Sequence, residues 1–207
     1  MVVTAIEVID KKKKKITLDS GSSLFLYNSE VRKFHLSEGN EVDPSDYEEL
    51  IAALNKRAKL KAMDLLKRSD KTEQELRTKL KKSNFSDDAV NVAVDYVMSY
   101  GYIDDERYAS NYIRTKKHSK SKRAIEFDLS SKGIDRETIS YCMDEEFKYE
   151  DETEAIKKQI RKKVNNLECL EDDKKQKLIA SICRKGFSYE KVKTAFRELE
   201  ENFDEEF

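Results

Sequence analysis

The chain has very few of the residues that end helices or form turns. Its 207 residues include one proline, five glycines and no tryptophan, whereas 40% of them are charged. This scarcity, together with abundant Lys, Glu, Leu and Ala, favours long helices over a many-stranded sheet. Few large apolar side chains remain for one deep core, so we expect several small helical cores.

Other absences exclude whole classes of protein. The cysteines, Cys142, Cys169 and Cys183, form no Cys-x-x-Cys pair, and their odd number argues against a disulfide scaffold. We expect reduced thiols that are buried rather than reactive. No apolar run approaches the roughly 20 residues that cross a bilayer, and the start, MVVTAIEVID, lacks the charged region of a secretory signal. We therefore expect a cytoplasmic protein that does not contact membranes.

The first part of the chain carries residues that are typical of strands. Residues 2–27 are rich in Val, Ile, Thr, Phe and Tyr with partial alternation, and residues 19–22 form a turn signal between apolar runs. This pattern predicts a small antiparallel sheet of two or three strands in a first domain, residues 1–42. The lysine run at 11–15 is expected at the first turn, either as a solvated loop or as a finger that contacts phosphate.

A long helix is expected after this sheet. Asp43 can cap the helix, and Pro44 at the first helical position sacrifices no hydrogen bond. Apolar residues then recur at spacings of three and four as far as Leu66, so the helix is expected to reach Arg68.

Three segments, which start at residues 75, 124 and 177, repeat one apolar pattern. Each places four apolar residues at spacings of 4, 5 and 5. The residue before the third of them is Asn84, Gly133 or Gly186, and these residue types tolerate the left-handed conformation that ends a helix. Ser or Asp stands two positions later and can cap the next helix. Each segment is therefore expected to be a helix, a tight turn and a second helix.

A preceding apolar helix completes each repeat into a three-helix module. Residues 72–75 of the first repeat form a capping box. We predict tandem modules at residues 43–102, 103–149 and 150–207, the last with an acidic C-terminal tail. The predicted fold class is mainly α, with three three-helix modules in an elongated array after a small antiparallel β segment.

The segment GYIDDERYA, residues 101–109, joins the first two modules. Gly101 is expected at the C′ position of the ending helix, and Asp104 is expected to cap the next helix. Asp105 complements the positive start of that helix, and Arg107 is expected to pair with a carboxylate across the joint. The aromatic members of this structural motif are Tyr102 and Tyr108.

The clustered carboxylates of this segment also raise the question of catalysis or metal binding. The capping positions account for every acid without such chemistry. The two histidines, His35 and His118, lie in no ligand-spaced motif. We therefore expect no catalytic residue, no metal and no cofactor, and hence no enzyme.

Several stretches carry a family resemblance. GYIDDERYA resembles the G-[YF]-[LI]-[DN]-D-x-R-[FY]-A segment of the RecX family of recombinase regulators, and KRAIEFDLSSKGI resembles the family's R-I-x-x-E-L-x-x-K-G-I segment. AMDLLKRSDKTEQELRTKL matches the family's ALDLL stretch, and the resemblance covers roughly residues 58–200. The chain departs from the family at Ser119 and Ser121, where glycine is common, and at Asp128, where Glu is usual.

The resemblance implies a non-enzymatic regulator in homologous recombination, DNA repair and the SOS response. Its partner would be the RecA recombinase filament on single-stranded DNA. The family's members lie in the filament groove and restrain extension, ATP hydrolysis and strand exchange, so we expect an inhibitor, acting as a monomer. Two alternatives remain open: a helical module that binds DNA directly, against which the net charge of −1 weighs, and an adaptor for another protein.

An acid-free stretch, which we call the basic bridge (residues 114–123), is the candidate contact surface. The segments that start at residues 144 and 198 are acidic in contrast. The bridge serves either solubility and module pairing, or contact with DNA phosphate or an acidic partner. Tyr108 and Tyr112 lie nearby at a core spacing, which favours packing over base stacking. We expect the bridge lysines to be exposed, so that reversing Lys116, Lys117, Lys120 and Lys122 to glutamate spares folding. The candidate contacts are Arg114, Lys116, Lys117, Lys120, Lys122, Arg123 and Lys132.

Overall fold

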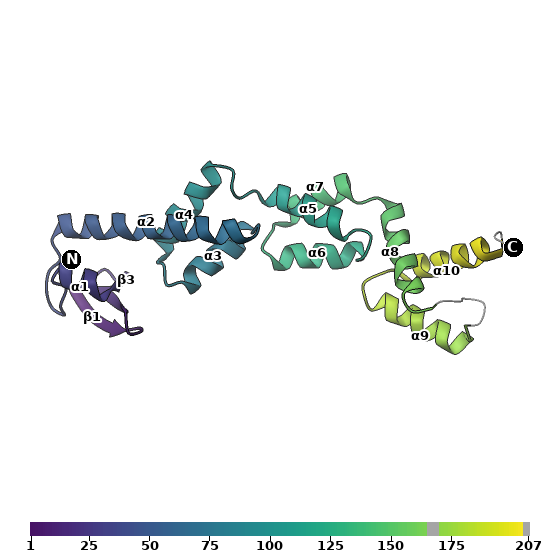
Figure 1. Ribbon diagram of the computed structural model, residues 1–207, viewed down its shortest axis with the longest axis horizontal. Helices are drawn as coiled ribbons and strands as arrows, with labels where there is room; N and C mark the ends of the chain where they lie inside the picture. Colours follow the sequence, from purple (N-terminus) through teal and green to yellow (C-terminus); the bar gives the residue numbers. More distant parts are fainter. Residues whose placement is uncertain (165–169, 205–207) are drawn as a thin grey trace. The chain divides into compact units, whose positions relative to one another are not determined.

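The chain folds into two compact units, Met1–Asp104 and Asp105–Phe207. The computed structural model describes residues 1–164 and 170–204 (Figure 1). The predicted fold class is confirmed, because the chain is mainly helical and begins with a three-stranded antiparallel sheet. Cys169 and the last three residues of the acidic tail lie outside the described residues. Within the described ranges, none of the helices combines the length and apolar character needed to cross a membrane.

The N-terminal sheet has the strand order β1-β2-β3. Its strands are β1 (Val3–Val8), β2 (Lys13–Leu18) and β3 (Ser23–Tyr27). The first turn is built by Asp10, whose carboxylate accepts hydrogen bonds from the backbone amides of Lys12 and Lys13 at 2.7 and 2.9 Å. The prediction that the whole lysine run lies at this turn is wrong. Asp10 closes the turn early, so Lys13–Lys15 are already paired within β2.

Two helices follow the sheet. The sequence pattern does not predict the first, α1 (Asn28–Lys33), whose opening turn is fastened by the Glu30 carboxylate accepting from the Tyr27 amide at 2.7 Å. The second, α2 (Pro44–Arg68), begins and ends as predicted. Its cap is Asp43, whose carboxylate accepts from the Ser45 amide at 2.8 Å.

The sheet, α1 and the first half of α2 share one apolar core. Alternate residues of the strands face it, and α2 contributes the buried Leu50 and Leu54. Burying one such side chain stabilises the fold by about 1.5–3 kcal/mol. The buried members are Val3, Ile16, Leu18, Leu24, Leu26, Val31, Leu36, Val42, Leu50 and Leu54.

The second half of α2 forms the first three-helix module with α3 (Glu73–Lys82) and α4 (Asp87–Ser99). The predicted capping box is present, since Thr72 accepts from the Glu75 amide at 3.1 Å and the Glu75 carboxylate accepts from the Thr72 amide at 3.4 Å. On α2, Ala58 and Ala62 are fully buried against the module core. Such small side chains allow α4 to pack closely on α2.

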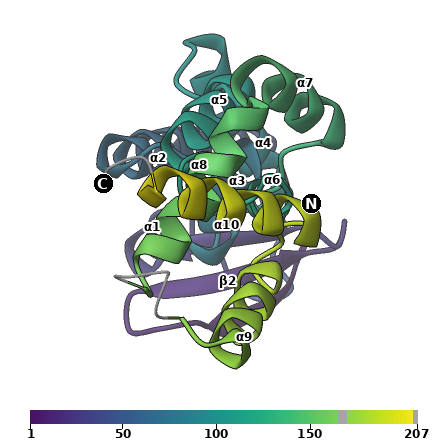
Figure 2. The same ribbon diagram turned by 90° about the vertical axis from the view of Figure 1, so that its right-hand side faces the viewer.

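The second unit contains two further modules, each with its own core. The helices of module 2 are α5 (Asp105–Lys116), α6 (Lys122–Ser131) and α7 (Arg136–Glu146). Those of module 3 are α8 (Tyr149–Arg161), α9 (Asp172–Cys183) and α10 (Tyr189–Asp204). Figure 2 shows α10 crossing α8, its main packing partner.

The predicted repeat turns are confirmed. Asn84, Gly133 and Gly186 all have positive φ, at 65°, 86° and 92°. At the first turn the Asn84 amide donates to Lys81 O at 2.9 Å and the next amide, of Phe85, donates to Leu80 O at 3.4 Å. This pair of bonds is a Schellman motif, which satisfies carbonyls that the helix end leaves open. The turn at Gly133 has the same two bonds, at 2.9 and 3.3 Å.

Candidate functional site

The joint motif at residues 101–109 is a helix end followed by a helix start. Gly101 has a φ of 67° after α4, and the Tyr102 amide donates to Val97 O at 3.0 Å. Asp104 directly precedes α5, while Asp105 and Arg107 lie in its first turn. A capping bond from Asp104 and a cross-joint ion pair of Arg107 stay predictions. Nowhere in the described ranges do three His, Cys, Asp or Glu side chains gather to hold a metal ion.

The basic bridge spans the end of α5, the following loop and the start of α6. Arg114 and Lys116 lie in the last turn of α5. Ser121 caps α6, because its hydroxyl accepts from the Ala124 amide at 3.2 Å. This serine is fully buried although most of its neighbours in the bridge are not. The bridge is therefore an anchored connection rather than a loose surface loop.

Half of the bridge cations are held in ion pairs within the second unit. Arg114 makes a two-armed contact with Glu146 at the end of α7, with Nε donating to Oε2 at 2.7 Å. Lys117 lies 3.1 Å from the Asp151 carboxylate and also donates to Glu146 O at 3.1 Å. Only 20% of the Lys117 side chain and 10% of the Asp151 side chain are exposed. These contacts tie the bridge to α7 and α8.

A second pairing of a bridge lysine lies within module 2. Lys120 donates to the Asp128 carboxylate at 2.5 Å, and the Tyr112 hydroxyl donates to the same oxygen at 2.7 Å. Burial alone would raise the pKa of Asp128, but hydrogen bonds from Lys120 and Tyr112 lower that pKa below its ordinary value. The hydrogen bond to Asp128 raises the pKa of Lys120 in turn. Asp128 is thus the acid that neutralises this end of the bridge.

At the joint between modules 2 and 3, burial and ion pairing again have opposite effects on the pKa of a carboxyl group. Burial by itself would raise the pKa of Asp151, but hydrogen bonds from the Lys148 amide and Lys117, with the charges of Lys117 and His118, lower it. His118 Nδ1 lies 3.4 Å from Asp151. The hydrogen bond from Arg114 likewise lowers the pKa of Glu146. Both acids therefore stay ionised near neutral pH and hold the bridge cations in place.

Three bridge cations remain for an external partner. Lys116, Lys122 and Arg123 form no ion pair within the described residues. That reversing four bridge lysines spares folding stays a prediction, but Lys117 and Lys120 are ion-paired within the second unit. Reversal there would place a new carboxylate against Asp151 and another against Asp128. The contact surface that the bridge offers is thus smaller than the sequence implies.

Lys132 and the two tyrosines of α5 have structural surroundings. Lys132 follows α6, and its Nζ lies 5.4 Å from the centre of the Tyr108 ring. The Tyr108 and Tyr112 rings stack with centroids 6.4 Å apart, and both pack against the core of module 2. As expected from their spacing, these tyrosines are half-buried packing residues.

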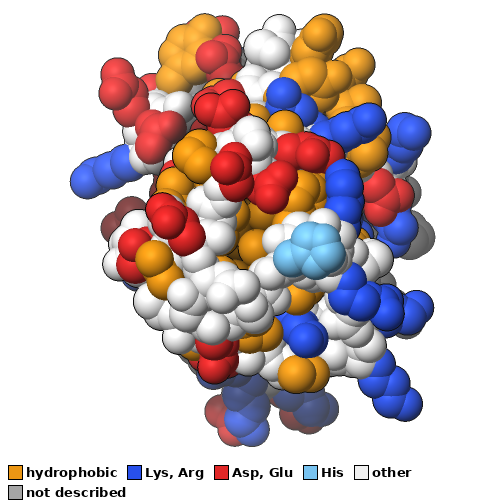
Figure 3. Space-filling model, turned by 90° about the vertical axis from the view of Figure 1, so that its left-hand side faces the viewer, with side chains coloured by type: hydrophobic (Ala, Val, Ile, Leu, Met, Phe, Trp, Pro, Cys, Tyr) orange, Lys and Arg blue, Asp and Glu red, His pale blue; other side chains and the backbone are white. Residues whose placement is uncertain are grey.

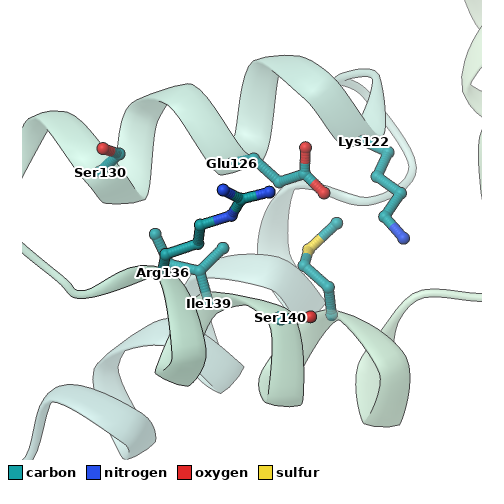
Figure 4. Close-up of a pocket in the computed structure, with 7 residues that line it drawn as sticks. Lys122, Glu126, Ser130, Arg136, Ile139 and Ser140 are labelled. Atoms are coloured by element: carbon teal, nitrogen blue, oxygen red, sulfur yellow. The ribbon is translucent and has the colours of Figure 1, made fainter.

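Next to the bridge, a groove of about 310 Å³ runs between α6 and α7. Figure 4 shows the side chains of Arg136 of α7 and Glu126 of α6 pointing toward one another across it, with Lys122 at one end. The buried Ile139 and Met143 line its apolar part. Lys122 therefore connects the bridge to a groove whose margin carries a second cation, Arg136.

The structure also brings together cations that do not belong to the basic bridge. A hollow of about 520 Å³ is lined by His118 of the bridge and by Lys158, Arg161 and Lys162 at the end of α8, with Glu154 as its acid. Three cations within five residues at the end of a helix form the only sequence signal. Ile156 and Ile160 of the same helix are buried, whereas Lys158 and Arg161 are exposed.

Comparisons with known proteins agree on one family. Models of the first, second and third three-helix domains of RecX match residues 58–96, 104–143 and 150–196. "Regulatory protein RecX" of Clostridium acetobutylicum is 31% identical, with 95% of each chain covered. The protein of the same name in Caldanaerobacter subterraneus subsp. tengcongensis is 30% identical, with 94% of this chain and 98% of the relative covered.

Solved structures give the same picture of the fold. The crystal structure of regulatory protein RecX superimposes with a TM-score of 0.61 at 25% identity, covering 94% of this chain and 98% of that one. RecX from Lactobacillus salivarius gives a TM-score of 0.63 at 24% identity over 72% of this chain and 98% of that one. The second likeness bears on the fold alone.

Proposed function

The chain belongs to the RecX family of regulatory proteins, and from this premise we propose that it inhibits the RecA recombinase. In this proposal it binds the RecA filament on single-stranded DNA, in the helical groove. It restrains filament extension, ATP hydrolysis and strand exchange. The protein acts by binding and has no catalytic residue of its own.

The observation that carries the residue-level proposal is the division of the basic bridge. Lys116, Lys122 and Arg123 have no ion pair within the described part of the chain, whereas their neighbours are neutralised internally. Unpaired surface cations attract phosphate and acidic protein surfaces, speeding association and fixing its register. These three residues, with Arg136 across the groove, are the proposed contacts in module 2.

The paired cations support the same proposal in a different way. Arg114, Lys117 and Lys120 hold the bridge against α7, α8 and α6. A surface that is already ordered loses less conformational entropy on binding. In this proposal the internal ion pairs are the support, and the three unpaired cations are the contact.

The test is RecA ATPase activity and strand exchange on single-stranded DNA, measured against the concentration of this protein. The variant reverses Lys116, Lys122 and Arg123 to glutamate, and circular dichroism checks its fold. The control reverses Lys177, Lys193 and Arg197, three exposed cations of module 3. We expect the bridge variant to need at least tenfold more protein for half-inhibition and the control to behave as the wild type.

Salt dependence adds a second readout. Raising salt from about 50 to 200 mM should weaken inhibition by the wild type more than by the bridge variant, because screening acts on favourable charge contacts. Undiminished inhibition by the folded bridge variant would remove the bridge from the mechanism. An equal loss in the control would mean that net charge rather than the bridge is responsible. No effect of the wild type on a cognate RecA would refute the inhibition itself.

A further inference from the structure

The first unit contains a basic groove that the proposed function does not use. Its volume is about 580 Å³, and it lies where the ends of β2 and β3 face α2 and the α3–α4 turn. Four cations line it, and they come from three separate parts of the chain: Lys13 from the strand, Arg57 and Lys61 from α2, and Lys82 from the end of α3. Folding therefore gathers cations that the sequence scatters over 70 positions.

Cations outnumber acids among the residues that line this groove. Asp64 is its only acidic lining residue, and that carboxylate is already engaged by Arg68 at 3.0 Å and by Lys61 at 3.7 Å. Lys13 and Lys82 have no ion pair within the part of the chain that the structure describes. Figure 3 shows that charges are unevenly placed on the face of this unit, with Lys and Arg along the right-hand margin and most acids toward the upper left.

The Arg57 side chain is held in place on one wall of the groove. Its guanidinium donates to the Glu30 carboxylate at 3.1 Å and to Phe25 O at 3.3 Å, and it lies 4.8 Å from the centre of the Tyr27 ring. Lys13 lies 5.3 Å from the same ring. The contacts between these cations and the ring hold the charges at defined positions on the groove wall.

Apolar side chains share the groove with the cations. Leu60 is 62% exposed and Tyr27 is 38% exposed, and the half-buried Phe85 lies at the turn. Exposed apolar groups beside cations suit a ligand that has both phosphates and accessible bases. A duplex offers mainly phosphates to such a surface, whereas a single strand also offers the faces of its bases.

We propose that this groove binds single-stranded nucleic acid directly, without RecA. Lys13 and Lys82 contact phosphates, and Leu60 and Phe85 contact bases. The proposal assigns a role to the N-terminal sheet, since Lys13 belongs to the lysine run and Tyr27 ends β3. It goes beyond RecA regulation and does not depend on it.

The experiment measures fluorescence anisotropy of a labelled 30-nucleotide poly(dT) strand with the full-length protein at about 50 mM salt. The variant reverses Lys13 and Lys82 to glutamate, and the control reverses Lys177 and Lys193, which changes net charge equally. We expect the groove variant to bind at least tenfold more weakly and the control to bind as the wild type. The slope of log affinity against log salt should fall by about 1.4 in the variant, since each lost phosphate contact on a single strand removes about 0.7.

A second variant, Leu60→Ser, changes a side chain that is 62% exposed and separates base contact from charge. It should weaken poly(dT) binding severalfold and leave the salt slope unchanged. Wild-type affinity in the folded Lys13/Lys82 variant would overturn the proposal, as would no binding by the wild type at micromolar concentration. A duplex of the same length bound as tightly as the single strand would overturn the assignment to single strands. Because the assay contains no RecA, its result is independent of the proposed inhibition.

Discussion

Replacement of Gly186 by alanine should destabilise the joint between modules 2 and 3. Gly186 has a φ of 92°, and a Cβ added to it would lie 2.6 Å from the Ser121 hydroxyl oxygen. That hydroxyl caps α6 through the Ala124 amide and donates to Lys185 O at 2.8 Å. The new methyl group therefore has to displace the side chain that holds the two modules together.

The loss of unfolding free energy in Gly186→Ala can be judged by comparison with Gly101→Ala. Both glycines have positive φ after a helix, and an added Cβ at Gly101 meets nothing within 4 Å. Gly101→Ala should cost only the left-handed strain, about 1–2 kcal/mol. Gly186→Ala should cost the same strain plus the disturbed cap, about 0.5–2 kcal/mol more. In a Ser121→Ala background, where the hydroxyl is gone, the cost of Gly186→Ala should fall to that of Gly101→Ala.

The assay is urea unfolding combined with amide hydrogen exchange, because separate cores need not unfold in one step. Exchange should speed up in α6 and α9 with Gly186→Ala and in α4 with Gly101→Ala. Equal costs for the two alanine variants would refute the reasoning. So would a cost of Gly186→Ala that is the same with and without the Ser121 hydroxyl.

Two further predictions concern turn geometry and pH. Asn84 has a φ of 65°, so Asn84→Gly should be neutral or slightly stabilising while Asn84→Val should cost about 1 kcal/mol or more; equal melting temperatures would contradict the assigned turn. The lowered pKa values of Asp128 and Asp151 mean that their stabilisation is present above the unfolded pKa and lost as pH falls through the folded one. Acid should therefore destabilise the second unit below about pH 4, and Asp128→Asn should make thermal stability less dependent on pH there. An unchanged pH profile in Asp128→Asn would show that this carboxylate does not contribute.

The parts of the fold that were predictable from the sequence depend on residues close together in the chain. Asn84 ends a helix and Ser86 starts the next because each acts on backbone groups within a few positions. The capping box of Thr72 and Glu75 is local in the same way. Three repetitions of one apolar spacing then fix three similar modules. The short helix α1 was not predicted because its N-cap residue is Tyr27, which is not one of the usual capping residues.

The candidate site was less predictable because its charges are balanced over long sequence separations. Arg114 pairs with Glu146, which is 32 residues away. Lys117 has Asp151 as its partner, in the next module. A run of like charges indicates a basic stretch, but only the folded chain decides which of its cations are neutralised. The groove beside Lys13 depends on α2 and α3 and has no signature in any one segment.

The ion pairs across the module joint have a consequence for work with shortened proteins. A fragment that ends after α7 would lose Asp151, the carboxylate that neutralises Lys117 and adjoins His118. It would also lose Gln159, whose amide donates to Ser119 O at 3.1 Å, and the Lys185 carbonyl that accepts from Ser121. The bridge of such a fragment would be more basic and less ordered than in the intact chain. DNA affinity measured on it would then be a truncation artefact, created by removing the acid that normally masks a lysine.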